Sequence, residues 1–167
     1  MKLYFKRKTL AFNDQILCLA DAEGNLVYDW KTSVMLAKKI RLFDAEKNAV
    51  AEIRQVLKSL LPKYQIFVDG EMVLEIKKEF HPILPKYTLT GQGWEMENKL
   101  LIYEYGVTKG AEQILTAGRS EDHLEWQFHA FEVEIPDPRN QLLAAAVAVA
   151  INIGIEGETF IEQHKNH

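Results

Sequence analysis

The residues of this sequence that could do chemistry include five histidines, one cysteine and several groups of charged side chains. The densest acid–base group falls in residues 121–129, where His123 and His129 occur among Glu121, Asp122 and Glu125. On an extended strand the two histidines point the same way, but they lie about 20 Å apart at roughly 3.3 Å per residue, too far to share one metal ion. We interpret them as surface polar residues, and we predict neither a metal site nor a cofactor.

Nucleophilic and nucleotide-binding motifs are absent from the sequence. It has no Walker loop, no GxGxxG, no HExxH and no GxSxG pattern. Cys18 stands alone in the apolar run Ile16-Leu17-Cys18-Leu19, which predicts a buried and inert thiol and excludes a disulfide framework. No catalytic residue is therefore predicted, and the sequence favours a protein that is not an enzyme.

Basic residues form three short clusters, which are Lys6 to Lys8, then Lys38, Lys39 and Arg41, then Lys77 and Lys78. Several cations that adjacent strands bring together would bind an anionic headgroup. We take the second and third clusters as a candidate anion or lipid-headgroup site. The alternative is that these residues cover solvated strand faces and protect sheet edges.

The overall charge and length limit the class of protein. Twenty basic and 24 acidic residues give a net charge of −4, which argues against a general nucleic-acid binder. We expect one domain over residues 1–155 and a polar tail over 156–167. The start, MKLYFKRK, lacks a following apolar run of signal-peptide length, so we expect a cytoplasmic protein, with a peripheral position at the membrane as one possibility.

The element with the clearest boundaries is a helix predicted over residues 138–153. Asp137 is a good N-cap, Pro138 suits the first turn, and Gly154 is a plausible stop. No charged residue occurs from 140 to 155, and apolar side chains point in every direction, so the helix must be surrounded. It is too short for a membrane span of about 20 residues, which favours a protein interior. The residues expected to pack there are Leu142, Leu143, Ala146, Val147, Val149, Ala150 and Ile151.

The segments before this helix read as strands. DAEGNLVYDW, DAEKNAVAEI and FVDGEMVLEI recur every 23 residues, from Asp21, Asp44 and Phe67, and each resembles a hairpin with a tight turn. Further strands are predicted over 99–107, 112–117 and 123–135. The alternation of apolar residues slips near His129 and Ala130, which predicts a bulge or corner there.

About 10 to 12 strands followed by one apolar helix favour a closed antiparallel barrel with the helix filling its interior. The sequence also resembles the bacterial branch of the LURP-one-related proteins, whose fold is similar to the tubby C-terminal domain. The resemblance rests on MKLYFKRK, on LLPKYQIFVDGEMVLEIKKEF over 60–80, on PKYTLTGQGWE over 85–95 and on the final helix. It implies a mainly β fold with about 12 strands around the central helix.

The resemblance implies little about chemistry. Proteins with the tubby-like fold include phosphoinositide-binding proteins and phospholipid scramblases, but none of their residue motifs can be carried onto this sequence. Our leading hypothesis is a non-enzymatic module that binds an anionic lipid surface or a protein partner through the barrel exterior. The alternatives are a calycin-like carrier of a small apolar ligand and an enzyme whose site is assembled from scattered residues.

Overall fold

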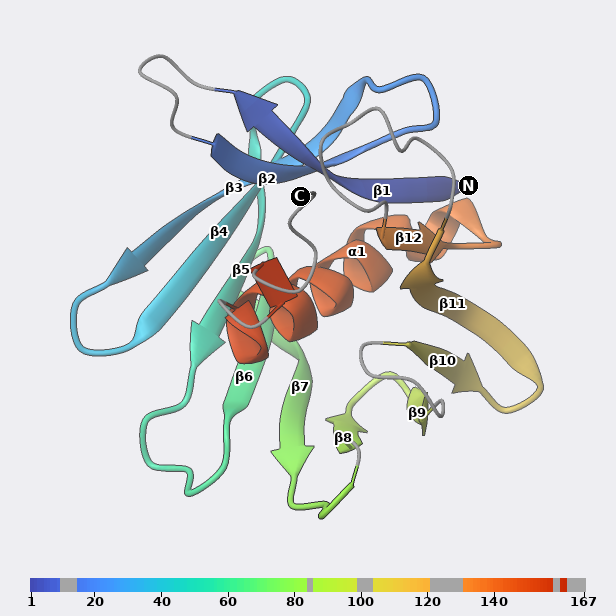
Figure 1. Cartoon of the computed structure of the whole chain (residues 1–167). Helices are drawn as coiled ribbons and strands as arrows, with labels where there is room; N and C mark the ends of the chain where they lie inside the picture. The colour runs from blue at the N-terminus through green and yellow to red at the C-terminus, as the bar shows by residue number, and fades with distance from the viewer. Residues whose placement is uncertain (10–14, 84–85, 99–103, 121–130, 158–159, 162–167) are drawn as a thin grey trace.

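A computed structural model describes residues 1–9, 15–83, 86–98, 104–120, 131–157 and 160–161 of the chain. Twelve antiparallel strands curve into a nearly closed barrel, and a helix near the C-terminus runs through its interior (Figure 1). The mainly β barrel with a central helix, predicted from the sequence, is therefore confirmed.

The strands follow one another around the barrel as an antiparallel meander, apart from one long-range pairing. Their bounds are β1 Lys2–Thr9, β2 Gln15–Ala20, β3 Leu26–Val34, β4 Lys38–Asp44, β5 Ala49–Gln55, β6 Lys63–Val68, β7 Glu71–Glu79, β8 Lys86–Thr90, β9 Glu95–Asn98, β10 Tyr105–Lys109, β11 Glu112–Arg119 and β12 Phe131–Glu134.

The long-range pairing joins the first strand to the last. Leu3 of β1 lies opposite Val133 of β12, and the Met1 amino group donates a hydrogen bond of 3.0 Å to the Ile135 carbonyl. Strands β8 and β9 occupy the two edges of the sheet. The first and last strands thus pair through residues up to 134 positions apart, and the open seam of the barrel lies between β8 and β9, which are consecutive in the chain.

The 23-residue repeat forms the hairpin turns that its sequence predicts. Asp21 Oδ1 accepts hydrogen bonds from the backbone N–H groups of residues 23 and 25, at 3.0 and 2.9 Å, and Asp44 Oδ1 does the same for residues 46 and 48, at 3.0 and 2.8 Å. Gly24 and Lys47, the residues at equivalent positions, both have positive φ, at 87° and 67°. Two copies of one short motif therefore give the same turn.

The predicted helix begins as the sequence indicates and ends later. A 3₁₀ turn, η3 (Pro138–Asn140), leads into α1 (Gln141–Val149), which widens into a π-helical segment, η4 (Ala150–Ile155). Asp137 caps the start by accepting a hydrogen bond of 3.0 Å from the Arg139 N–H. Gly154 does not stop the helix, contrary to expectation, because the wider π turn continues through it to Ile155.

The helix is buried in the way that its uncharged sequence predicts. The side chains from residue 144 to residue 152 are fully shielded from solvent, Leu142 and Leu143 are half-buried, and the alanines let the strands approach closely. Beyond the helix, where the sequence suggested a polar tail, Phe160 is buried against Phe5 and Phe131, with ring centroids 5.3 and 5.2 Å away. This part of the chain also contributes to the core.

Some of the remaining sequence predictions agree with the structure, and others concern residues that it does not describe. Strands β10 and β11 overlap the segments predicted over 99–107 and 112–117, and Cys18 is buried as expected. The predicted bulge near His129 and Ala130 lies outside the described residues, as do His123 and its acidic neighbours.

Candidate functional site

The two ends of the barrel differ in the kind of connection they carry. Successive connections of an antiparallel meander alternate between the ends, so the β3–β4, β5–β6 and β7–β8 loops share one end, at the lower left and bottom of Figure 1. We call residues 35–38, 56–63, 80–83 and Lys86 the lysine rim. The opposite end carries the turns at 21–25, 44–48 and 69–71, which we call the acidic rim.

Charge is separated between the two rims. The acidic rim has six acidic residues and one lysine, namely Asp21, Glu23, Asp44, Glu46, Asp69, Glu71 and Lys47. Within its ranges the lysine rim has four lysines, Lys38, Lys58, Lys63 and Lys86, and no acidic residue. Glu79, at the end of β7, lies beside the rim and opposite Lys86. A chain with a net charge of −4 therefore has three neighbouring loops that carry lysines and no carboxylate.

Large apolar side chains are exposed on the same lysine rim. Met35 is 92% exposed and Phe80 is 81% exposed, and Leu60 is fully exposed at the tip of the β5–β6 loop. The full set on and beside this rim is Val34, Met35, Leu36, Leu57, Leu60, Phe80 and Ile83. Next to the acidic rim, Met72 is exposed to 50%. Exposed apolar groups gathered on three neighbouring loops are typical of an interaction surface.

The five basic residues predicted as an anion site do not form one cluster. Side chains alternate along a strand, so Lys38 continues the inward face of β4 beyond buried Ile40, and Lys78 continues the inward face of β7 beyond buried Ile76. Lys38 Nζ donates a hydrogen bond of 2.8 Å to the Ile153 carbonyl. Lys78 Nζ lies 2.8 Å from Oε1 of Glu156. Both lysines hold the end of the central helix.

The other three residues of the predicted site face outward at separate places. Lys39 Nζ lies 3.6 Å from Glu52 Oε1, the Arg41 guanidinium lies 5.9 Å from the centre of the Phe43 ring, and Lys77 Nζ lies 3.9 Å from Glu79 Oε1. Of these residues, Lys77 lines the largest groove described below.

Three tyrosines complete the polar contacts at the end of the helix. Tyr64 donates a hydrogen bond of 3.0 Å to the Gly154 carbonyl, Tyr87 one of 2.5 Å to Glu156 Oε1, and Tyr105 one of 2.6 Å to Asn152 Oδ1. The π turn accounts for part of these contacts. Its hydrogen bonds have a wider spacing than those of an α-helix, so the carbonyls of Ile153 and Gly154 accept hydrogen bonds from side chains. These tyrosines are not predicted from the sequence, although Asn152 within an apolar helix signals a polar contact in the core.

The electrostatics of this polar cluster fit a structural role. Burial raises the pKa of the Tyr105 hydroxyl far above its usual range, and burial also raises the pKa of Tyr64. Both hydroxyls therefore stay protonated and act as hydrogen-bond donors at neutral pH. Asn152 is fully buried, and its Nδ2 has no hydrogen-bond partner within the described part of the chain.

A groove of about 650 Å³ opens on the lysine rim, between the β5–β6 loop and β7. Its lining combines apolar residues with three lysines and one serine, and the full set is Val56, Lys58, Ser59, Leu60, Leu61, Lys63 and Lys77. Lys63 Nζ lies 3.1 Å from Glu75 Oε1, whereas Lys58 has no ion-pair partner among the described residues. The groove therefore offers apolar surface beside uncompensated positive charge.

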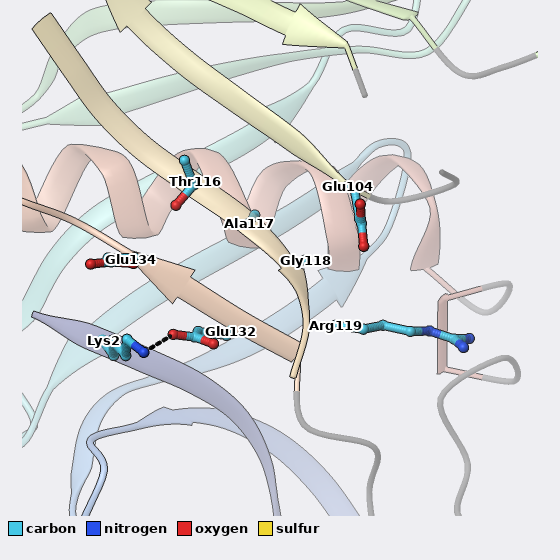
Figure 2. A pocket seen from close by; sticks show the side chains of 8 residues that line it. All are labelled: Lys2, Glu104, Thr116, Ala117, Gly118, Arg119, Glu132 and Glu134. Atoms are coloured by element: carbon cyan, nitrogen blue, oxygen red, sulfur yellow. Dashed lines mark ion pairs between the residues drawn. The ribbon is translucent and has the colours of Figure 1, made fainter. Parts of the chain in front are cut away.

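A second groove is polar and lies on the outer faces of β1, β11 and β12. Figure 2 shows Lys2 paired with Glu132, with a distance of 2.9 Å between Nζ and Oε1, and Glu134 and Glu104 on either side. Arg119 points away from these carboxylates (Figure 2). The groove has a volume of about 340 Å³ and few apolar groups, so it offers no surface for an apolar ligand.

A third groove, of about 210 Å³, is lined by Arg41 and Arg54, and the charge of Arg54 is already compensated. Arg54 donates hydrogen bonds to Glu52, and its guanidinium stacks 4.0 Å from the centre of the Phe67 ring. The 650 Å³ groove is thus the best candidate binding site of the three.

The barrel wrapped around an uncharged helix defines a class of protein, and the family model of the LURP-one-related proteins matches residues 1–152. The chain belongs to this family. A relative named the uncharacterised protein YxjI, from Bacillus subtilis (strain 168), is 24% identical over 153 residues, which cover 92% of this chain and 93% of the relative. No solved structure matches the chain significantly.

Two further observations concern membranes and metals. In the described ranges, no helix is long and apolar enough to cross a bilayer. The same residues contain no group of three or more His, Cys, Asp or Glu side chains that could hold a metal ion. The family and the fold fit a non-enzymatic binding module.

Proposed function

We propose that this protein is a non-enzymatic module that docks on anionic phospholipid surfaces through its lysine rim, on the cytoplasmic side of a membrane. The observation that carries the proposal is that exposed apolar side chains and lysines occur together on three neighbouring loops, whose residues 35–38, 56–63 and 80–83 include no acidic residue. Apolar side chains enter the boundary between headgroups and acyl chains, and each lysine near an anionic surface contributes about 1 kcal/mol.

The acidic rim supports this orientation. A net charge of −4 would keep the molecule away from an anionic surface if the charge were spread evenly. Because the acidic turns lie at the opposite end of the barrel, they are farthest from the membrane when the lysine rim is in contact. Screening over about 8 Å at physiological ionic strength weakens their repulsion further.

The packing at the barrel centre disfavours the calycin-like carrier. The helix occupies the interior, and its side chains from 144 to 152 are fully buried against the strands. An apolar ligand inside the barrel would have to displace these residues. An enzyme with a scattered site is disfavoured by the tyrosines at the helix end, whose hydroxyls are engaged as donors to the helix.

Co-sedimentation with vesicles tests the proposal. We expect binding to vesicles that contain phosphatidylglycerol and little binding to pure phosphatidylcholine. A triple variant with one change in each loop, Leu36→Ser, Leu60→Ser and Phe80→Ser, should lose most of the binding, because each exposed apolar side chain contributes on the order of 1 kcal/mol on insertion. The matched control is Met72→Ser, which removes an exposed apolar side chain near the acidic rim and should bind normally.

Two outcomes would contradict the proposal. Equal and negligible binding of the natural sequence to both kinds of vesicle would exclude docking on anionic lipid. Unchanged binding of the triple variant would show that another surface meets the membrane. If the natural sequence binds no vesicles and the triple variant loses affinity for a protein partner, the lysine rim would instead be assigned to protein recognition.

A further inference from the structure

The β5–β6 loop is held in place more firmly than an ordinary long connection. The Val56 N–H donates a hydrogen bond of 2.8 Å to the Lys63 carbonyl, which closes the base of the loop. The Lys78 N–H donates a hydrogen bond of 2.8 Å to the Pro62 carbonyl, which ties the loop to β7, and Pro62 restricts the backbone further. The groove between this loop and β7 is therefore formed before any ligand arrives, which lowers the entropic cost of binding.

The groove combines two kinds of surface in one place. Val56, Leu60 and Leu61 supply apolar side chains, and the lysines Lys58, Lys63 and Lys77 line the same groove. Glu75 and Glu79 partly compensate the second and third of these charges, while the first is uncompensated within the described structure. A ligand that fills this groove must carry an anionic group and an apolar part joined together.

The volume of the groove indicates how large a ligand it could hold. A volume of about 650 Å³ falls in the range of small-molecule sites, which is roughly 300–1,000 Å³. A bare phosphate would leave the apolar lining unused, and a neutral hydrocarbon would leave the Lys58 ammonium group without an anion. A phospholipid headgroup with the first part of an acyl chain satisfies both.

We infer that this groove is a binding site for one anionic phospholipid molecule, with its phosphate near Lys58, Lys63 and Lys77 and part of an acyl chain against Val56, Leu60 and Leu61. The inference rests on the proposed docking of the lysine rim, since the bilayer supplies the lipid. It adds a defined single site to what would otherwise be a diffuse attraction between lysines and a charged surface.

Monomeric lipids separate this site from docking on a membrane. Dihexanoyl phosphatidylglycerol, kept below its micelle concentration, should bind the full chain saturably with one molecule per protein, as measured by calorimetry or by NMR shifts confined to the groove. Dihexanoyl phosphatidylcholine should bind at least about fivefold more weakly, because its headgroup has no net negative charge. Glycerol 3-phosphate should bind at least about tenfold more weakly, because it has no acyl chains.

Matched variants locate the site. Lys58→Gln combined with Lys77→Gln should weaken binding of the monomeric anionic lipid by about tenfold or more. Lys86→Gln removes a lysine of the same rim that does not line the groove, so it should leave this affinity unchanged. Equal losses in the two variants would overturn the site in favour of general electrostatic attraction.

The unaltered chain gives a test that depends on no variant. Affinity should rise from dibutanoyl to dihexanoyl phosphatidylglycerol, because longer chains cover more of the apolar lining. Affinity independent of chain length, or no saturable binding of either monomer, would overturn the inference. If the protein still binds anionic vesicles in that case, the lysine rim docks on membranes without a lipid site, and if it does not, both proposals fail.

Discussion

The acidic rim and the lysine rim are two ends of one barrel built in opposite ways. At the acidic rim, Asp21 and Asp44 each accept two backbone hydrogen bonds, and Asn25 and Asn48 donate back to them at 3.3 and 3.2 Å. At the lysine rim, the loops expose apolar side chains and leave Lys58 without an ion-pair partner among the described residues. Side chains at the acidic rim build turns and stabilise the fold, whereas the loops opposite carry exposed groups, which our proposal assigns to membrane binding.

The largest effect we expect comes from the helix that supports both rims. Val147→Asp places an unpaired charge where the side chain is fully buried, and this costs several kcal/mol against a total stability of about 5 to 15 kcal/mol. The domain should unfold, which circular dichroism would show as the loss of its cooperative thermal transition. Leu60→Ser is the control, since that side chain is fully exposed. A folded variant with an unchanged melting temperature would contradict the role of the helix.

A smaller loss of stability should distinguish the polar contacts at the end of the helix from those of a turn on the acidic rim. Glu156→Ala leaves Lys78 and the Tyr87 hydroxyl without their carboxylate, at a position where the Glu156 side chain is only 8% exposed, and should destabilise the protein by about 2 kcal/mol. Asp44→Ala removes the hydrogen bonds of one turn on the acidic rim and should cost about 1 kcal/mol. Urea denaturation of both variants measures the difference. An equal cost would mean that the polar cluster at the helix end is no more important than a surface turn.

The smallest effect concerns single charges and compares the two rims directly. Lys86→Gln should weaken binding to vesicles containing phosphatidylglycerol about fivefold, because one lysine near the surface contributes about 1 kcal/mol. Lys47→Gln removes the same charge from the acidic rim and should leave vesicle binding unchanged. Similar losses in both variants would show that net charge, and not its position, governs the attraction.

Much of the fold was predictable because it depends on local chemistry. Asp137 and Pro138 mark the start of the helix, its uncharged sequence requires burial, and the repeated Asp-Ala-Glu motif predicts the turns. Leu61-Pro62-Lys63-Tyr64 recurs as Leu84-Pro85-Lys86-Tyr87, and β6 and β8 both begin at the lysine of this motif. Each of these signals is read from residues only a few positions apart.

The candidate site was less predictable because it depends on strand faces and on distant contacts. Lys38 and Lys39 are neighbours in sequence, yet they lie on opposite faces of β4, and the same holds for Lys77 and Lys78 on β7. The alternation with Ile40 and Ile76 contained this information. The meeting of Tyr64, Tyr87 and Tyr105 with the helix end could not be predicted, since it joins residues 47 to 90 positions apart. The π turn that aligns them has no clear sequence signal.

The position of the helix along the chain has a consequence for biosynthesis. The ribosome releases the twelve described strands before the segment around which they close, and β1 must wait for β12 to complete its pairing. Until then the nascent chain holds a curved sheet with an uncovered apolar face, and such intermediates aggregate or require chaperones. We therefore expect premature termination before residue 138 to yield insoluble product, whereas a loss of only the last few residues would spare the helix.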